Sequence, residues 1–149
     1  MINTVEITSE SIKGFGTLLS TSDLPATWDT DDFKFTPDVF TFNYRPKLTV
    51  GILVGKKRDF KLDLMERHSA TSEILVQLEN DGILFLAKPD WDAPSMDAVI
   101  PFLLRQGMAV ALLSGTWHWV PYPVDETCTT LILFSEGTLD HDQLIKEVN

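Results

Sequence analysis

The feature that most limits the fold of this chain is a series of short apolar runs, separated by turn residues, from Leu48 onward. The strands that these runs predict span residues 49–54, 60–67, 74–78, 83–87, 108–113, 117–120 and 129–134. Asn80-Asp81-Gly82 separates two of them and is a strong hairpin signal, because Asn, Asp and Gly favour the backbone of tight turns. Many short strands with frequent turns predict an antiparallel barrel or jelly roll, which is a mainly β fold.

The residues before this β-rich stretch are of a different kind. Residues 8–14 predict a helix of one or two turns, capped at its start by a hydroxyl side chain and ended by its glycine. Residues 20–47 contain three prolines among polar and aromatic residues. This composition predicts an irregular arm with one strand, at residues 39–44.

Two further helices are expected. Ser95 can cap a helix over residues 96–105, which Pro101 would shorten or kink. Residues 138–148 predict a surface helix with acids in its first turn. We therefore expect one domain over residues 1–149, with a helix and arm at 1–47, a barrel core at 48–135 and a C-terminal helix at 136–149.

Charge and composition narrow the class of partner. The 149 residues carry 12 basic and 22 acidic side chains, a net charge of −10, whereas nucleic acids and anionic membranes are bound by basic surfaces. We therefore expect neither as a partner. Cys128 is the only cysteine, which excludes an internal disulfide and, with no signal-like apolar start, favours the cytoplasm. An acidic small-molecule substrate would need local cations or a metal ion.

Glu66, His68 and Glu73 form an acid-x-His-x4-acid pattern on two consecutive predicted strands. Side chains alternate along a strand, so Glu66 and His68 continue the face begun by Leu62 and Leu64, which we expect to be the core side. Glu73 then approaches His68 from the next strand. A buried carboxylate or imidazole is costly unless it is paired, ligated or open to a pocket. The pattern therefore predicts a functional site.

Two residues near this motif are candidates for substrate binding. Gln77 shares the face of Glu73 and is expected deeper on the same side. Arg67 is expected to point outward, although a bulge in its strand would turn it inward as an anchor for a carboxylate.

The run Gly115-Thr116-Trp117-His118 supplies a second imidazole. Its glycine permits a tight turn, and its histidine alternates with the indoles of Trp117 and Trp119. With Tyr122, these indoles predict the apolar wall of a small-molecule pocket. The alternative interpretation is that the tryptophans fill the core and the histidine is a hydrogen-bonded core residue.

Two histidines and two glutamates at one end of a barrel support two kinds of chemistry. His68, Glu73 and His118, with Glu66 as a further donor, suit one divalent metal ion such as Ni, Mn, Fe or Zn. The same four side chains suit metal-free acid–base catalysis, with a histidine as the base and a glutamate as the acid. The sequence leaves both open.

At these residues the chain resembles the ureidoglycolate lyase family, formerly called ureidoglycolate hydrolases. The family's Glu-Arg-His, followed after four residues by Gln, is similar to Glu66-Arg67-His68 with Glu73 in the place of Gln. The family's Trp-His is similar to Trp117-His118, and its opening resembles residues 12–16. The resemblance implies a cupin fold, an RmlC-like jelly-roll barrel or double-stranded β-helix.

The chain departs from the family at three places. Trp119 stands where the family has the second histidine of Trp-His-His-Pro. Ala111-Leu112-Leu113 replaces a polar Asn-Tyr-His segment, and Ser135-Glu136 replaces Asp-Arg. The loss of an imidazole and a cation can change the substrate while the fold is kept.

The resemblance implies a lyase that splits ureidoglycolate into glyoxylate and urea, which is carbon–nitrogen cleavage within allantoin degradation and purine catabolism. It also implies a homodimer. Two alternatives stay open at this point. One is a non-catalytic cupin that binds a small molecule, and the other is a different metal-dependent cupin enzyme acting on a small hydroxy acid or sugar.

Overall fold

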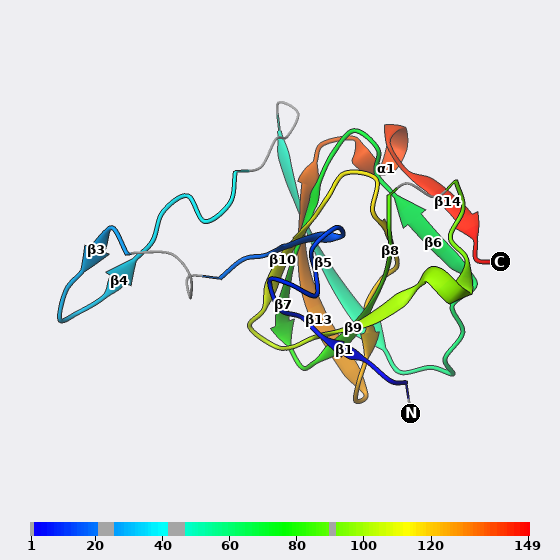
Figure 1. Cartoon of the computed structure of the whole chain (residues 1–149), viewed down its shortest axis with the longest axis horizontal. Helices are drawn as coiled ribbons and strands as arrows, with labels where there is room; N and C mark the ends of the chain where they lie inside the picture. The colour runs from blue at the N-terminus through cyan, green and yellow to red at the C-terminus, as the bar shows by residue number, and fades with distance from the viewer. Residues whose placement is uncertain (1, 21–25, 42–46, 90–91) are drawn as a thin grey trace.

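Two β-sheets of the chain face one another and enclose a common core, as Figure 1 shows. The computed structural model describes residues 2–20, 26–41, 47–89 and 92–149. The described chain is mainly β, with one 3-10 turn and one four-residue α-helix, neither of them long enough to cross a membrane. The architecture is a jelly-roll barrel of the cupin type, as the sequence predicts.

The larger sheet, here called sheet A, has seven strands. Its order is β1 (Val5–Glu6), β9 (Ile100–Leu104), β8 (Gly82–Ala87), β11 (Trp117–His118), β6 (Leu64–Arg67) and β14 (Leu144–Glu147), and β12 (Tyr122–Pro123) also pairs with β8. β1 and β9 run parallel, and the other pairs are antiparallel. The register of β11 places His118 between Leu86 and Glu66, in the middle of the sheet.

The second sheet, sheet B, has five strands. Its order is β2 (Gly16–Leu18), β10 (Ala109–Leu112), β7 (Glu73–Glu79), β13 (Thr127–Ser135) and β5 (Leu48–Lys56). β5 and β13 are paired over their whole length, from Thr127 opposite Lys56 to Ser135 opposite Leu48. β5 is therefore a long edge strand.

Both faces of β8 are buried, so sheet A separates two hydrophobic clusters. Leu84 and Leu86 point into the barrel and belong to a cluster that includes Leu75 of sheet B. Ile83 and Phe85 point to the other side. The cluster there, here called the outer cluster, consists of Leu62, Met65, Ile83, Phe85, Ala87, Trp117 and Tyr122. An almost continuous apolar run is the sequence pattern of a strand buried on both faces.

Residues 26–41 form an arm with a two-stranded sheet of its own, β3 (Trp28–Asp29) and β4 (Lys34–Phe35). Figure 1 shows the arm standing clear of the barrel. Within the described residues, β3 and β4 pair only with each other. The strand expected at 39–44 is absent from 39–41, and its remaining residues lie outside the described ones.

The prediction of a helix over residues 96–105 is wrong. Only Met96–Ala98 is helical, as a 3-10 turn, and the chain then continues as β9. Burial of Phe102 and Leu104 in the barrel core outweighs the cap-like Ser95. On this side of β9, β1 pairs only with residues 102 and 103. Pro101 therefore has no strand partner on that side to which it would have to donate a hydrogen bond, and a strand tolerates proline at such a position.

The prediction of a helix over residues 138–148, in the C-terminal segment 136–149, is correct only for its first turn. α1 spans only Thr138–His141, and β14 then pairs antiparallel with β6. One or two helical turns are marginal in water, whereas the free edge of β6 offers a full ladder of backbone hydrogen bonds. The pairing places Ile145 opposite Glu66, beside the predicted site.

Some other elements are shorter than expected. Residues 8–14 form hydrogen-bonded turns rather than a helix, although Gly14 has the positive φ, 91°, of a stop residue. The strand expected at 60–67 begins only at Leu64, and the one expected at 117–120 ends at His118.

Asn80-Asp81 forms the expected tight turn, but this turn does not close a hairpin. Asn80 has a φ of 55°, which is in the left-handed region. However, β7 before the turn belongs to sheet B and β8 after it belongs to sheet A. The turn is therefore a corner between the two sheets, and the expected hairpin is wrong because both strands pair with segments distant in sequence.

Candidate functional site

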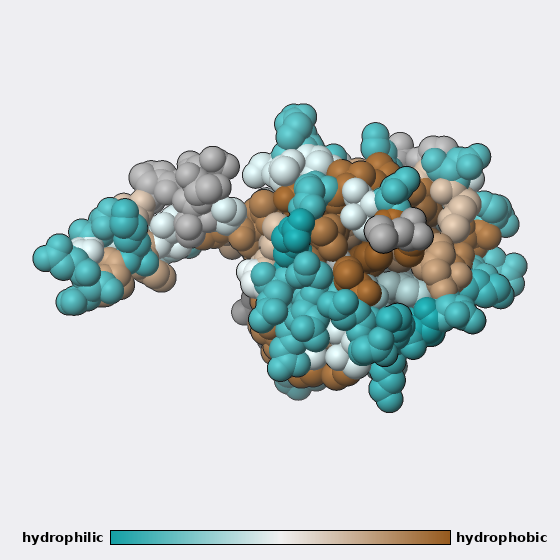
Figure 2. All heavy atoms as spheres, turned by 90° about the horizontal axis from the view of Figure 1, so that it is seen from below, coloured by the Kyte–Doolittle hydropathy of each residue, from teal (hydrophilic) through white to brown (hydrophobic). Residues whose placement is uncertain are grey.

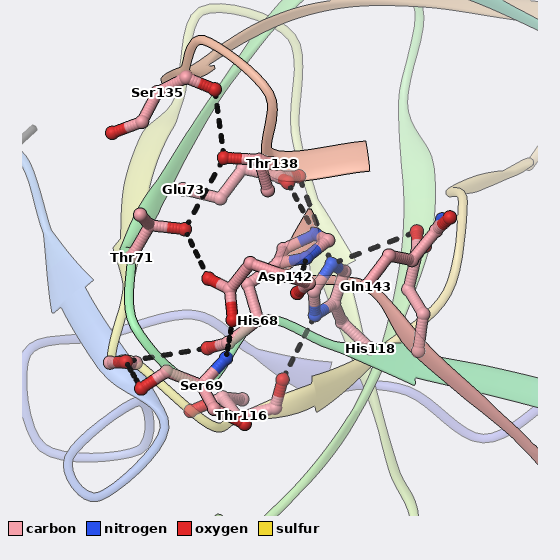
Figure 3. Close-up of polar contacts among 12 residues, drawn as sticks. His68, Ser69, Thr71, Glu73, Thr116, His118, Ser135, Thr138, Asp142 and Gln143 are labelled. Carbon is pink, nitrogen blue, oxygen red and sulfur yellow. Dashed lines mark hydrogen bonds and ion pairs between the residues drawn. The ribbon is translucent and has the colours of Figure 1, made fainter. Parts of the chain in front are cut away.

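Four ionisable side chains meet inside the barrel (Figure 3). Glu66 belongs to β6 and His68 directly follows it, Glu73 begins β7, and His118 ends β11. The pairing of β11 with β6 places His118 opposite Glu66. Glu66 and His68 are two residues apart, so they share the inward face, as the alternation of a strand requires.

These four side chains form one network of close contacts. His68 Nε2 lies 3.1 Å from Glu73 Oε2, and His118 Nε2 lies 3.8 Å from both Glu66 Oε1 and Glu73 Oε1. The centroids of the two imidazole rings are 5.2 Å apart. Both histidines and Glu73 are less than a tenth exposed, so their charges interact through a medium far less polarisable than water.

Backbone carbonyls hold the other nitrogen of each ring. His68 Nδ1 donates to the Asp142 carbonyl at 3.0 Å, and His118 Nδ1 donates to the Thr116 carbonyl at 2.9 Å. A carbonyl only accepts, so each Nδ1 carries a hydrogen and the neutral ring has its lone pair on Nε2. Both Nε2 atoms are buried, and the nearest polar atoms to them among the described residues are the carboxylate oxygens of Glu66 and Glu73. Histidines that ligate metals are held in this way by their second nitrogen.

Glu66, His68 and His118 can hold a metal ion. One ligand atom from each of them lies within 4.8 Å of the others. Glu73 flanks this group through its contacts with both histidines. The sequence predicts Glu73 as a ligand with Glu66 as a further donor, and the structure brings both carboxylates to the histidines. Two imidazoles and a carboxylate suit a first-row divalent ion.

The protonation of His68 is set by opposing influences. Burial, the largest single one, lowers its pKa. The hydrogen bond and the charge of Glu73 oppose this, with further help from the Asp142 carbonyl and Glu66, and the net result is a pKa raised above the usual 6.5. A proton therefore competes with a metal ion for the lone pair of Nε2.

A pocket of about 370 Å³ opens above the two carboxylates. Among the described residues that line it, Glu66 and Glu73 are the only charged ones. Its other lining residues are Gly51, Ile52, Leu53, Val120, Ile132, Phe134 and Leu139. The pocket has the volume of a small-molecule site, with an apolar wall and two acids. No lysine or arginine is among the described residues that line it.

Arg67 and Trp117 lie on the opposite face of sheet A from the histidines. Trp117 is fully buried in the outer cluster. The guanidinium of Arg67 lies 4.7 Å from the centroid of a Trp117 ring, and its Nη1 donates to the Pro89 carbonyl. Both residues were predicted to bind substrate, and the structure does not bring them to the pocket.

The other three predicted substrate-binding residues are also placed away from the pocket. Trp119 packs against the outer cluster, and Tyr122 belongs to it. Gln77 shares the inward face with Glu73 but lies four residues further along β7, about 13 Å away. There its side chain accepts a hydrogen bond from the hydroxyl of Thr130.

Two residues that sequence reasoning missed hold the site in place. The Asp142 carbonyl accepts from His68, and its carboxylate accepts from the backbone N–H groups of Ser69 and Ala70 and the hydroxyl of Thr71. The amide of Gln143 donates to Glu66. Because residues 138–148 were expected to be a surface helix, both were placed in solvent. The pattern of this segment carries no signal of its pairing with β6.

The model of the ureidoglycolate lyase family matches residues 1–148. The chain belongs to the ureidoglycolate lyase family. This confirms the resemblance read from Glu66-Arg67-His68 and Trp117-His118, and membership makes the protein a lyase. In a comparison with curated proteins, no protein matches this chain.

Among solved structures, the chain is similar to procruciferin, an 11S globulin from Brassica napus, with a TM-score of 0.45 and 11% sequence identity. The match covers 91% of this chain and 28% of that chain, so the chain spans little more than a quarter of the globulin.

Proposed function

We propose that this member of the ureidoglycolate lyase family splits ureidoglycolate into glyoxylate and urea in the pocket above Glu66 and Glu73. The observation that supports this most directly is the convergence of two histidines on the two glutamates that line that pocket. Membership in the family supports the type of reaction.

The reaction requires the movement of one proton. The reacting carbon of ureidoglycolate carries a hydroxyl group and the ureido nitrogen. A base takes the hydroxyl proton, the oxygen electron pair forms the carbonyl of glyoxylate, and the carbon–nitrogen bond breaks. The electron pair of that bond stays on the nitrogen, which takes a proton and leaves as urea. No oxidant, reductant or water is consumed.

Glu73 is the residue to which we assign this proton. Its carboxylate is buried at the floor of the pocket and lies 3.1 Å from His68 Nε2. Burial next to an imidazole suits a group that must accept a proton and give it back within one turnover. Glu73 accepts the hydroxyl proton and returns it to the leaving nitrogen. The Nε2 atoms of His68 and His118 lie 3.1 Å and 3.8 Å from oxygens of this carboxylate.

Glu66, His68 and His118 would hold a divalent metal ion, with Ni, Mn, Fe and Zn as the candidates. Such an ion, when bound, supplies positive charge for the substrate's carboxylate and makes its hydroxyl easier to deprotonate. The described lining of the pocket has no cation and the chain carries a net charge of −10, so its own side chains offer an anion little attraction. The Asp142 and Thr116 carbonyls keep both Nε2 atoms turned inward.

The test is urea release from ureidoglycolate by the purified chain, supplied in turn with each of the four ions, together with its metal content. Glu73→Gln keeps the shape of the side chain but removes its basicity. We expect this variant to keep the metal and to lose urea release by a factor of about 10² or more. Glu10→Gln, at an exposed turn, is the matched control and should behave as the wild type. Absence of urea with every ion, or full activity in Glu73→Gln, would contradict the proposal.

The apolar wall of the pocket favours a second candidate function, which is binding of a small molecule without turnover. Ureidoglycolate is polar throughout, whereas the side chains of Ile52, Ile132 and Phe134 offer it no hydrogen bond. A ligand with a polar head at the glutamates and an apolar tail would also contact this wall. Calorimetry with 2-hydroxy acids of increasing alkyl length separates the two functions. Affinity that rises with chain length, without urea release from ureidoglycolate, favours the binding protein.

A further inference from the structure

A second pocket, of about 450 Å³, lies on the outer face of sheet A, across that sheet from the two histidines. Its floor consists of three side chains on neighbouring strands. Ile83 of β8 is paired with Leu103 of β9 on one side and with Tyr122 of β12 on the other. We call it the outer pocket, and its volume is in the range of small-molecule sites. Among its other lining residues are Ile2, Lys57, Arg58, Phe60 and Val124.

The loop between β5 and β6 forms one wall of the outer pocket, and contacts with Tyr122 hold it in place. The guanidinium of Arg58 lies over the Tyr122 ring, 3.7 Å from its centroid. The hydroxyl of the same tyrosine donates to the Lys61 carbonyl. Phe60, which lies between these two residues in the loop, packs edge-on against the ring with the centroids 5.3 Å apart. The wall is therefore formed by the protein alone, before any ligand binds.

The outer pocket is a place of positive charge on an acidic protein. Residues 56–58 are the only run of three consecutive basic residues in a chain with a net charge of −10. Lys57 and Arg58 line the outer pocket, and no acid is among the described residues that do so. The pocket above Glu66 and Glu73 has the opposite composition, with two acids and no described cation. An anion is therefore attracted to the outer pocket more than to the other one.

Both cations are available to a ligand. Arg58 contacts a ring and donates from Nη1 to the Lys56 carbonyl at 3.1 Å, and no carboxylate among the described residues is paired with it. Lys57 Nζ lies 2.8 Å from Glu126 Oε1, but both side chains are more than half exposed. An exposed ion pair of this kind contributes little to stability, so a ligand can replace the glutamate at small cost.

The charge is confined to one end of a larger apolar hollow. A smaller pocket, of about 160 Å³, adjoins the outer pocket, and Ile2 and Phe60 line both of them. The other residues that line the smaller pocket are all apolar and are Leu62, Phe85, Met96, Val99 and Pro101. Figure 2 views the barrel from the end at which the N-terminus lies, and hydrophobic atoms reach the surface there between hydrophilic ones. A ligand with one negative group and an apolar body matches this arrangement.

We propose that the outer pocket is a second binding site, which takes a monocarboxylate with an aromatic or aliphatic body. Arg58 and Lys57 bind the carboxylate through charge-assisted hydrogen bonds. Phe60 and the floor of the pocket remove the apolar body from water. This inference is independent of the proposed reaction, because it uses none of the ionisable residues on the inward face of sheet A.

The test is calorimetry of the full-length chain with naphthalene-2-carboxylate and with decanoate, each beside its neutral amide. At least one carboxylate should bind with a dissociation constant on the order of 100 µM, and its amide should bind at least about tenfold more weakly. The tighter of the two carboxylates shows whether the site prefers an aromatic or an aliphatic body. Because the attraction is between charges, added salt should weaken the binding of the carboxylate and leave that of the amide unchanged.

Substitutions assign the binding to the outer pocket. Arg58→Gln and Lys57→Gln should each weaken binding of the carboxylate by about tenfold, whereas Lys56→Gln, an exposed neighbour that does not line the pocket, should stay within about twofold. Val124 lines the pocket and is 46% exposed, so its replacement should not disturb the fold. Val124→Asp should weaken binding, and Val124→Lys should strengthen it or leave it unchanged. A loss of folding, which circular dichroism would detect, does not produce this dependence on the sign of the charge.

The other pocket needs its own control. Ile52→Asn, at an exposed position in the pocket above the two glutamates, should bind the carboxylates as the wild type does. Binding of neither carboxylate overturns the proposal, as does equal binding of a carboxylate and its amide. A loss of binding in Ile52→Asn but not in Arg58→Gln, or the same effect from Val124→Asp and Val124→Lys, also overturns it.

Discussion

The two faces of sheet A at β6 and β11 are built from alternating residues of the same short strands, yet they differ completely in chemistry. The inward face carries Glu66 and His118, with His68 just beyond β6. The outward face carries Met65 and Trp117, both fully buried in the outer cluster. A step of one residue along a strand therefore separates a group that can bind a metal from a group that stabilises the fold.

The comparison also shows that burial has a different meaning on each face. Met65 and Trp117 are buried among apolar side chains, which is favourable by itself. His68 and His118 are equally buried, but their Nε2 atoms face the carboxylates of Glu66 and Glu73, an arrangement that favours a cation between them, either a proton or a metal ion. We therefore expect substitutions on the inward face to affect metal binding and activity, and those on the outward face to affect stability.

The largest effect is expected from His118→Ala on the inward face. It removes one of the three ligand atoms that lie within 4.8 Å of one another. Bound metal, measured by elemental analysis, and urea release should both fall to background, while circular dichroism stays that of the folded protein. His141→Ala, at an exposed histidine of α1, is the control and should keep both. Full metal content in His118→Ala would rule out the metal centre described here.

The outward face should respond in the opposite way to Trp117→Ala. Removal of a fully buried indole from the outer cluster should lower the free energy of unfolding by about 3–5 kcal/mol, measured by urea denaturation. The folded fraction should still bind the metal ion. Trp28→Ala, on the exposed arm, should cost less than about 0.5 kcal/mol in the folding of one chain. Loss of metal from the folded Trp117→Ala variant would contradict the claim that the outward face affects stability alone.

Asp142→Ala should have an intermediate effect on both stability and metal affinity. Its carboxylate ties down residues 69–71 just after His68, and its carbonyl, which the variant keeps, holds the imidazole. We expect a loss of about 1–3 kcal/mol in unfolding free energy and about a tenfold loss in metal affinity, because loss of its carboxylate frees the loop that carries His68. Asp140→Ala, at an exposed neighbour in α1, should leave both unchanged. An Asp142 variant with wild-type metal affinity would show that the loop is held by other contacts.

The smallest effect is expected from Arg67→Ala. The guanidinium stacks on Trp117 on the outward face, so its removal should cost about 1 kcal/mol in stability. The Michaelis constant for ureidoglycolate and the metal content should remain within about twofold of the wild type, because the side chain does not reach the pocket. A tenfold rise in the Michaelis constant would instead show that Arg67 turns inward when substrate binds, as a bulged strand would allow.

Local patterns were sufficient to predict the β-rich class and the four ionisable residues now found together. The alternation of residues 61–68 indicated that Glu66 and His68 share a face. This is confirmed, because Glu66 contacts His118, His68 contacts Glu73, and these two partners contact each other. The same alternation predicted Leu64 as buried and Met65 as exposed, and both predictions are wrong. The prediction assumed that only one face of the strand is buried. In the structure Met65 is the buried residue and Leu64 is exposed.

The elements that were predicted wrongly share one physical cause. Residues 100–104 and 144–147 are strands only because β8 and β6 offer them hydrogen-bonding edges, and neither edge is visible in the segment itself. Asp142 and Gln143 were missed for the same reason, since their role depends on the pairing of β14 with β6. Short segments adopt the structure that their distant neighbours allow, even against their local helical signals.

By itself, the sequence determined the mainly β class, the family and the kinds of donor atoms in the site, because turn residues, alternation and ligand-type motifs are properties of neighbouring residues. The tertiary structure decided which face of each strand is inward, which tryptophans fill the outer cluster, and which carbonyls orient the imidazoles. These depend on pairing between strands that are distant in sequence, such as β6 with β14 and β1 with β9, where Val5 pairs with Phe102. The hydrogen bonds and burial that select one pairing arise only when the sheets assemble.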